Sequence, residues 1–311
     1  MLVIYGPAAY RIISLSMDKS QAAIATASPG SPANTSDPGA DIQLQGIVQE
    51  YPAAEGPGVT RVIDGIDLHM NKAGIYMLLG PSGCGKSTLL YMMGGVRPLG
   101  IRYPTAGRVL IDGQECTGVH EDAVMVFQRY ANRPDLTARD NIALPFRFKL
   151  WKQRVPQREW GSRVDRMIEA VGLADKAELR PGQLSGGQNQ RVALARALVL
   201  KPRILLMDEP FGALDAQTRE EMQRLLVGLW EQQRCVIVFV THDVTEALLL
   251  GDRVIVLSTQ PARIADDFTI AEPRPRGAAW QRSPETVRLE ERILERLHAG
   301  TGSRGQIRVS V

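Results

Sequence analysis

The stretch Gly80-Pro-Ser-Gly-Cys-Gly-Lys-Ser-Thr88 decides the fold of this chain. Its spacing, Gly-x-x-x-x-Gly-Lys-Ser, lets backbone N–H groups close around a polyphosphate. A short apolar run, Ile75–Leu79, precedes it, and a helical pattern from Lys86 to Gly94 follows. Strand, glycine loop and helix form the context that a phosphate-binding loop requires, because the helix N-terminus adds its dipole to the cradle. A glycine-rich turn that matches by chance is the alternative, and these flanking elements disfavour it.

The residue types inside this loop predict a nucleotide triphosphate and Mg²⁺ as ligands. The ammonium group of Lys86 would reach the β- and γ-phosphates, and the Ser87 hydroxyl would be a ligand of Mg²⁺. We therefore expect the whole loop to contact the nucleotide: Gly80, Pro81, Ser82, Gly83, Cys84, Gly85, Lys86, Ser87 and Thr88.

Two carboxylates stand at the end of a second apolar run, Ile204-Leu-Leu-Met-Asp208-Glu209. Ionised carboxylates at the end of a buried strand are costly without a cation or hydrogen-bond donors. We expect Asp208 to hold the Mg²⁺ hydration shell and Glu209 to act as general base on the attacking water. The alternative is a pair that caps the next helix, which the phosphate-binding loop upstream makes less attractive.

His242 and Gln128 each follow an apolar run, Val236–Val240 and Val124–Phe127 respectively. The carboxyl ends of parallel strands converge on the ligand crevice of an open α/β sheet. His242 is therefore expected to contact the γ-phosphate, and Gln128 to contact Mg²⁺ and water. A purely structural histidine is the competing interpretation.

The rest of the chain alternates between strand and helix patterns. Residues 18–40 are rich in Ser, Ala, Pro, Gly and Asp and predict a disordered leader. Further strands are predicted at Ile42–Val48, at Val59–Leu68 with a turn at Asp64-Gly65, and at Arg108–Ile111. Helical patterns cover residues 138–180, Val192–Leu200, and a final stretch from Ser283 to His298.

Composition excludes several classes of protein. The 311 residues are 44% hydrophobic and 23% charged, with a net charge of +3 that gives no argument for nucleic acid. Three cysteines at wide spacings indicate reduced thiols rather than zinc or a disulfide framework. The longest apolar run is far shorter than the roughly 20 residues of a membrane span, so we expect a soluble, cytoplasmic chain.

Taken in order, these markers resemble the nucleotide-binding subunit of an ATP-binding cassette (ABC) transporter. They are the phosphate loop, Gln128, the signature Leu184-Ser-Gly-Gly-Gln188, Asp208-Glu209, Gly212-Ala-Leu-Asp215 and His242. The resemblance implies an α/β P-loop NTPase fold with a mainly parallel core sheet, an antiparallel β subdomain and a helical subdomain. The implied domains are a leader (1–40), the ATPase domain (41–265, helical subdomain about 135–190) and a tail with one amphipathic helix (266–311).

The same resemblance implies a dimer, either of two copies or with a paired cassette subunit. The signature of one subunit would cap ATP held by the phosphate loop of the other, with Ser185, Gly186, Gly187 and Gln188 as contacts. Asp215 would lie at the dimer seam, and Tyr51 would stack on adenine, although Tyr51 could equally be an ordinary loop residue.

Features around the core are similar to the nitrate, sulfonate and taurine importers of this family. They are Tyr51-Pro52 before Gly56-Pro57, and Ser258–Ile264 followed by Pro273-Arg-Pro-Arg276. This implies ATP-driven uptake of a small anion through a separate membrane permease, indirectly with a solute-binding protein, at the cytoplasmic face of the inner membrane. Asn132-Arg133-Pro134-Asp135 departs from the group's apolar pattern and predicts a more polar contact with the permease. The alternatives are an importer of another small solute and a soluble ABC ATPase of translation or DNA maintenance.

Overall fold

The computed structural model describes residues 39–53, 57–97, 101–128 and 131–299. Most of the predicted leader therefore lies outside the described residues. Its last two residues are placed: Ala40 is buried, and the carbonyl of Gly39 accepts a hydrogen bond from Arg203 Nη2 at 3.0 Å.

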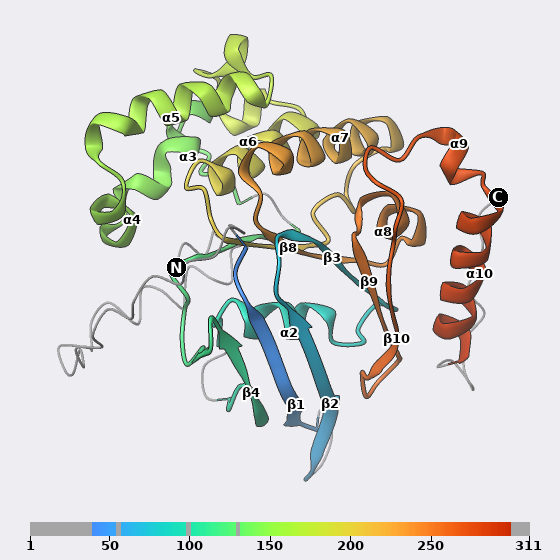
Figure 1. Cartoon of the computed structure of the whole chain (residues 1–311). Helices are drawn as coiled ribbons and strands as arrows, with labels where there is room; N and C mark the ends of the chain where they lie inside the picture. The colour runs from blue at the N-terminus through green and yellow to red at the C-terminus, as the bar shows by residue number, and fades with distance from the viewer. Residues whose placement is uncertain (1–38, 54–56, 98–100, 129–130, 300–311) are drawn as a thin grey trace, which may run out of the picture.

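Within the described residues, six strands form the larger sheet in the order β10-β9-β3-β8-β7-β6 (Figure 1). They are β3 (Gly74–Leu79), β6 (Ala123–Val126), β7 (Ile204–Asp208), β8 (Val236–Thr241), β9 (Arg253–Leu257) and β10 (Ile264–Thr269). All neighbours pair in parallel except β10, which runs antiparallel to β9. Strands β3, β6, β7 and β8 are buried along their whole length, as expected for a parallel sheet covered on both faces. The predicted mainly parallel core is confirmed.

A smaller antiparallel sheet has the order β2-β1-β4-β5 among the described residues. Its strands are β1 (Ile42–Pro52), β2 (Val59–Met70), β4 (Ala106–Ile111) and β5 (Gln114–Glu115). The predicted turn at Asp64-Gly65 is wrong, because β2 continues through it and pairs with β1 on both sides. The register shifts near this point and Gly65 has φ 69°, so the glycine accommodates an irregularity in the ladder rather than a chain reversal.

Helix α2 (Lys86–Met93) lies between the two sheets (Figure 1). Its apolar side chains Leu89, Leu90 and Met93 are fully buried in a cluster that also contains Ile42 of β1 and Val238 of β8. The helix that follows the phosphate-binding loop is therefore held on both sides, which fixes the direction of its N-terminus.

The predicted helical region of residues 138–180 is helical but interrupted. The elements are α3 (Ala138–Ala143), η1 (Leu144–Arg147), α4 (Lys149–Arg154), α5 (Gln157–Ala170), η2 (Ala174–Lys176) and η3 (Pro181–Gln183). Pro145 and Pro156 stand at two of the breaks, and Gly172, with φ 66°, follows the end of α5. Helix α6 (Gly186–Leu198) begins six residues earlier than the predicted Val192.

The last part of the chain packs back on the core. It contains α7 (Ala216–Gln233), α8 (Val244–Leu250), α9 (Ala278–Gln281) and α10 (Pro284–Ala299). The predicted helix from Ser283 to His298 is present as α10, and Ser283 Oγ caps it by accepting the Thr286 N–H at 3.2 Å. Ile293 is fully buried, and Leu289 and Leu297 pack against the main core cluster, so this face of α10 is covered by the same chain.

Arginines of the Pro273-Arg-Pro-Arg276 segment tie the tail to the end of α8. Arg276 Nη1 donates to the carbonyls of Leu248 and Gly251 at 2.7 Å each, and Arg274 Nη1 donates to that of Leu250 at 3.0 Å. Cations near a helix C-terminus are favoured by the unpaired carbonyls and the dipole.

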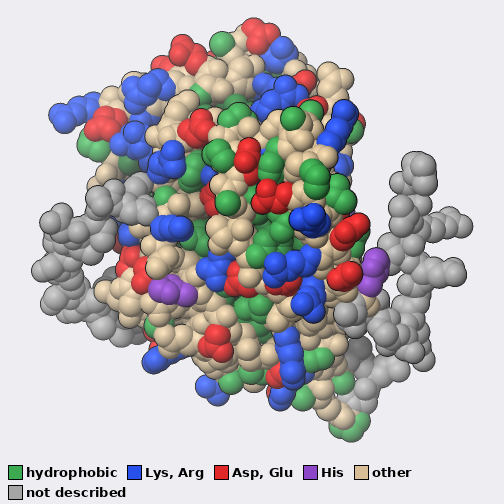
Figure 2. Space-filling model, turned by 45° about the vertical axis from the view of Figure 1, so that its right-hand side comes forward, with side chains coloured by type: hydrophobic (Ala, Val, Ile, Leu, Met, Phe, Trp, Pro, Cys, Tyr) green, Lys and Arg blue, Asp and Glu red, His purple; other side chains and the backbone are tan. Residues whose placement is uncertain are grey.

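Charged side chains of both signs intermingle on the face drawn in Figure 2. None of the described helices is long and apolar enough to cross a membrane. All three cysteines are free and buried.

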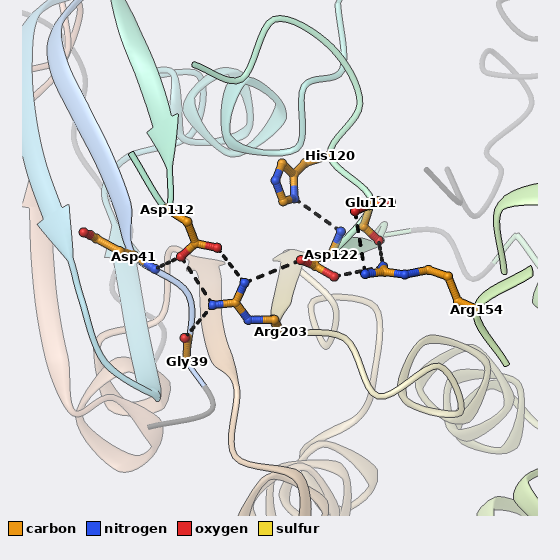
Figure 3. Close-up of polar contacts among 8 residues, drawn as sticks. All are labelled: Gly39, Asp41, Asp112, His120, Glu121, Asp122, Arg154 and Arg203. Carbon is orange, nitrogen blue, oxygen red and sulfur yellow. Dashed lines mark hydrogen bonds and ion pairs between the residues drawn. The ribbon is translucent and has the colours of Figure 1, made fainter. Parts of the chain in front are cut away.

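An ion-pair network joins three parts of the molecule at the edge where β6 and β7 begin (Figure 3). Arg203 Nη1 lies 2.5 Å from Asp112 Oδ2, just after β4, and 3.5 Å from Asp122 Oδ2, just before β6. Arg154, the last residue of α4, donates to Asp122 Oδ1 at 2.9 Å. The antiparallel sheet, the core sheet and the helical region are thus connected at the amino edge of the core sheet, opposite the site described next.

Candidate active site

The phosphate-binding loop joins β3 to α2 at the carboxyl edge of the core sheet. Gly85 is the N-cap of α2 with φ 112°, a conformation that side-chain-bearing residues rarely adopt. Ser82 and Gly83 are exposed, and the Gly83 carbonyl accepts a hydrogen bond from Gln260 Nε2 at 2.7 Å. Cys84 is buried, and burial raises the pKa of its thiol, so it packs under the loop as a neutral group.

Lys86 is buried and is folded back on the loop. Its Nζ donates to the carbonyls of Gly80 and Pro81 at 2.8 Å each and lies 3.9 Å from Glu209 Oε1. The cation is therefore already positioned inside the glycine loop, where a polyphosphate would meet it.

Ser87 and Asp208 meet at the centre of the site. Ser87 Oγ donates to Asp208 Oδ1 at 2.7 Å, and Tyr91 Oη donates to Asp208 Oδ2 at 2.9 Å. Burial raises the pKa of Asp208, while these two hydrogen bonds act in the opposite direction. Tyr91 is not among the residues predicted from the sequence, although it is four residues after Ser87 on the same helix face, a spacing that could have suggested it.

Glu209 follows Asp208 in a strained conformation. Its φ is 43°, which is uncommon for a residue with a side chain and is typical of functional sites. Its Oε2 lies 3.2 Å from His242 Nδ1, and its backbone N–H donates to the Val240 carbonyl at 3.1 Å. The strain directs the carboxylate toward Lys86 and His242 rather than along the strand.

A small cavity of about 40 Å³ lies beside Glu209 and His242, large enough for water. Glu246 also lines it and is buried. Thr241 Oγ1 and Gln223 Nε2 donate to the Glu246 carboxylate at 2.7 and 3.0 Å. Burial raises the pKa of Glu246. This residue is not among those predicted, since a single glutamate in a helical run carries no signal.

Gln128 is exposed just after β6 and comes near the same centre. A Cβ added at Gly212 would lie 3.9 Å from Glu209 Oε2 and 4.0 Å from Gln128 Nε2, so both side chains border this glycine. The structure thus brings together Lys86, Ser87, Asp208, Glu209, His242 and Gln128 from four strand ends.

The signature motif lies elsewhere, at the N-terminus of α6. Ser185 caps the helix: its Oγ accepts the Gln188 N–H at 3.2 Å, and Gln188 Oε1 accepts the Ser185 N–H at 2.9 Å. Ser185 and Gly186 are exposed. Among the described residues, no hydrogen bond or ion pair connects this motif to the phosphate-binding loop of the same chain.

Asp215 is brought next to the signature. It caps α7 by accepting from Thr218 N at 3.0 Å and Thr218 Oγ1 at 2.7 Å, and these bonds lower the pKa of its carboxyl group. A Cβ on Gly187 would come within 2.4 Å of Thr218 Cγ2, so glycine lets α6 approach α7 here without a shift of the threonine side chain.

Tyr51 lies at the end of β1 and is half-buried. It is an electrostatic neighbour of Tyr103, whose hydroxyl donates to the Thr88 carbonyl at 2.6 Å. Burial raises the pKa of Tyr103, which stays neutral. Tyr51 therefore lies near a side chain that is bonded to the last residue of the phosphate-binding motif.

Comparisons with known proteins show the family of this chain. The family model described as "ABC transporter" matches residues 63–212. The bicarbonate transport ATP-binding protein CmpD of Synechocystis sp. is 39% identical over 259 residues, which are 83% of this chain and 87% of that protein. The nitrate import ATP-binding protein NrtD of Synechococcus elongatus is 40% identical over 254 residues, which are 81% and 89% of the two chains.

Solved structures of ATP-binding cassettes have the same fold as this chain. A dimeric ATP-binding cassette, MJ0796, in a post-hydrolysis state bound to ADP and Pi, superposes with a TM-score of 0.61 and 31% identity over 76% of this chain and 99% of that one. The predicted fold class and family are confirmed. This chain belongs to the ATP-binding cassette transporter family and is one of its ATP-binding, ATP-hydrolysing subunits.

Proposed function

We propose that two copies of this chain close around two ATP molecules and use the closure to drive solute uptake through a separate permease. The observation that carries the proposal is the position of Glu209, between Lys86 and His242 and beside the bonded Ser87–Asp208 pair. Each half-site is incomplete by itself. Among the described residues, the exposed signature motif at the N-terminus of α6 makes no hydrogen bond to the phosphate-binding loop of its own chain. A second subunit would supply that motif.

The oxygen donors at the centre fit Mg²⁺, which prefers hydroxyl, carboxylate and water oxygens. Ser87 Oγ and the buried Asp208 carboxylate, already 2.7 Å apart, would hold the ion with Gln128 at the margin. When bound, Mg²⁺ neutralises charge on the transferred phosphoryl group.

The protein's own groups divide the remaining work. Lys86, buried among loop carbonyls, would exchange these for phosphate oxygens. Glu209 would take the proton of the attacking water in the adjoining cavity, while His242 orients the Glu209 carboxylate and contacts the γ-phosphate. Loss of that phosphate removes contacts that only ATP provides, so the dimer reopens.

The remaining predicted contacts are those between the two subunits and those with the adenine base of ATP. Ser185, Gly186, Gly187 and Gln188 present a helix N-terminus, which suits a phosphate anion. Asp215, packed beside this motif through Thr218, would lie at the seam. The half-buried Tyr51 ring would stack on adenine.

The transported solute is proposed to be a small inorganic anion such as nitrate or bicarbonate. Two of the similar proteins carry these solutes in their names, and both are ATP-binding subunits of transport systems. Permease subunits would bind the helical region from the membrane side, with an external binding protein acting indirectly. The ATPase would then lie at the cytoplasmic face of the inner membrane.

The test combines hydrolysis, assembly and uptake. Glu209→Gln should bind Mg²⁺–ATP, lose most turnover and form a dimer visible by light scattering, while the wild type stays mostly monomeric during turnover. Cells that carry this variant in place of the wild type should lose uptake of isotopically labelled nitrate or bicarbonate. Full ATPase activity in the variant would remove Glu209 from its role. Lost ATPase activity with unchanged uptake of both anions would favour another solute or a soluble ABC ATPase.

A further inference from the structure

A chain of side-chain amides connects the segment after Gln128 to the signature motif of the same subunit. Asn132 Nδ2 donates to the backbone carbonyl of Asn189 at 2.9 Å and to its Oδ1 at 3.0 Å. Asn189 lies on α6, four residues after Ser185, and is only 9% exposed. Two segments 57 residues apart in sequence are thus joined by one amide group.

Asn189 passes this contact on to the loop that enters the signature. Its Nδ2 donates to the carbonyls of Pro181 at 2.9 Å, Leu184 at 3.2 Å and Ser185 at 3.1 Å. Three carbonyl acceptors on one side require the amide nitrogen there, so the Asn189 oxygen must face Asn132. The orientation of both amides follows from backbone acceptors and is not ambiguous.

The segment around Asn132 is itself fixed to the helical region. Arg196, fully buried on α6, donates to the Ala131 carbonyl at 3.1 Å. Asn141 of α3 accepts the Arg133 N–H at 2.7 Å and donates to the Arg133 carbonyl at 3.0 Å. The Ala131–Arg133 stretch is therefore held as part of the helical region, three positions after Gln128, which borders Glu209.

We propose that Asn132 and Asn189 are positioning residues: they fix the position of the signature Ser185 relative to the segment that follows Gln128 in the same chain. This inference rests on the proposed ATP-bound dimer. It explains why the Asn132–Asp135 stretch is polar: Asn132 is directed inward to α6, and Arg133 pairs with Asp135 at 2.7 Å. A displacement of the Ala131–Arg133 stretch on nucleotide binding would act on the start of α6 through the Asn132–Asn189 amide pair, while Arg196 holds the same stretch further along α6.

The experiment uses the full chain with Glu209→Gln as parent and measures the ATP concentration for half-maximal dimerisation by light scattering. Asn132→Asp is isosteric and places a carboxylate opposite two oxygen acceptors, which removes the bridge. It should raise the half-maximal ATP concentration about five- to tenfold, the equivalent of roughly one hydrogen bond. ATP affinity of the monomer, read with a fluorescent nucleotide at low protein concentration, should change by less than about twofold.

Two further experiments test the effect of the added charge and the coupling between the two asparagines. Asn71→Asp makes the same substitution at an exposed position after β2 and should leave dimerisation unchanged. Asn132→Ala combined with Asn189→Ala should cost less than the product of the two single effects, because both changes remove the bond from Asn132 Nδ2 to Asn189 Oδ1. Asn189→Ala also removes the bonds to the Pro181, Leu184 and Ser185 carbonyls, so it should be the larger single change.

Three results overturn the inference: Asn132→Asp dimerising at the parent's ATP concentration, equal losses in monomer affinity and dimerisation, or multiplicative effects of the alanine pair. If Glu209→Gln itself fails to dimerise with Mg²⁺–ATP, the proposed function fails first, and the inference falls with it. The asparagine variants then play no part in that conclusion.

Discussion

The two edges of the core sheet are built on opposite principles. At the carboxyl edge, Glu209 has φ 43° and Lys86 is buried against loop carbonyls with its nearest carboxylate oxygen at 3.9 Å. At the amino edge, Arg203 pairs with Asp112 and Asp122 (Figure 3). Asp112 also has a positive φ, of 50°, in the turn between β4 and β5. Each edge contains a residue with positive φ, so the difference lies in the charges: the carboxyl edge leaves them partly compensated, and the amino edge pairs them closely. We therefore expect mutations at the carboxyl edge to change mainly ATPase activity and mutations at the amino edge to change mainly stability.

The largest expected effect comes from Glu209→Gln at the carboxyl edge. Loss of a general base lowers turnover by about 10²–10⁴-fold. The matched control is Glu121→Gln at the amino edge, whose carboxylate lies 3.7 Å from Arg154 Nη2 and is 54% exposed. Steady-state ATPase assays should show the control within about twofold of wild type. A Glu209→Gln enzyme with more than a tenth of normal turnover would contradict the comparison.

Tyr91→Phe should have an intermediate effect. It removes the donor to Asp208 Oδ2, so the pKa of this buried carboxyl group rises further and the ionised form becomes rarer. The acid limb of the pH–rate profile should move to higher pH, and half-saturating Mg²⁺ should increase by up to roughly tenfold. Tyr76→Phe, which loses a hydrogen bond to the Lys72 carbonyl away from the site, is the control and should leave both readouts in place.

Arg203→Ala should lower stability and spare catalysis. The side chains of Arg203 and Asp112 are each 39% exposed, so solvent screening limits the loss to about 1–2 kcal/mol of unfolding free energy. Urea unfolding measures this loss, and ATPase activity at a temperature well below the transition should change by less than about twofold. Arg224→Ala, which breaks an exposed pair with Glu220, should cost under about 0.5 kcal/mol. A tenfold loss of activity in Arg203→Ala would show that the edges are not independent.

The smallest expected effect is a change in acid stability. Partial burial raises the pKa of Asp112, but hydrogen bonds from Arg203 and from the Asp41 N–H outweigh it, so the folded-state pKa lies below its ordinary value of 3.8. The unfolded state then binds the proton first, and this stabilisation is present above about pH 4 and lost as the pH falls through the folded pKa. Unfolding midpoints from about pH 5 to pH 3 should fall less steeply in Arg203→Ala than in wild type. An identical slope would assign the acid response to other carboxylates.

The local pattern of the sequence is sufficient for the strands and loops that carry the site. A fully buried strand such as β7 is an unbroken apolar run in the sequence, and the polar residues that follow it must lie at its carboxyl end. The phosphate-binding loop, Asp208-Glu209 and His242 can therefore be located from these local patterns alone. Strands β9 and β10 are not predicted, since Arg253–Leu257 is a short run and β10 mixes exposed and buried positions.

Side-chain contacts between distant segments cannot be predicted from local sequence patterns. Tyr91 on Asp208, Glu246 under Thr241, and Asn132 on Asn189 each join different elements of the fold. A hydrogen bond between side chains leaves no periodic trace in the sequence, because either partner alone is compatible with a solvated surface. The predicted turn at Gly65 is wrong for a related reason: a glycine permits φ 69° in a turn and in an irregular ladder alike.

The sequence by itself determined the family, the ATPase chemistry and the order of the motifs, because glycine spacing and strand-end carboxylates are local requirements of phosphate and Mg²⁺ binding. The tertiary structure decided which side chains meet: it directed Glu209 to His242, separated the signature from the loop of its own chain, and tied Asn132 to Asn189. These outcomes depend on the packing of elements far apart in sequence, which no local pattern specifies.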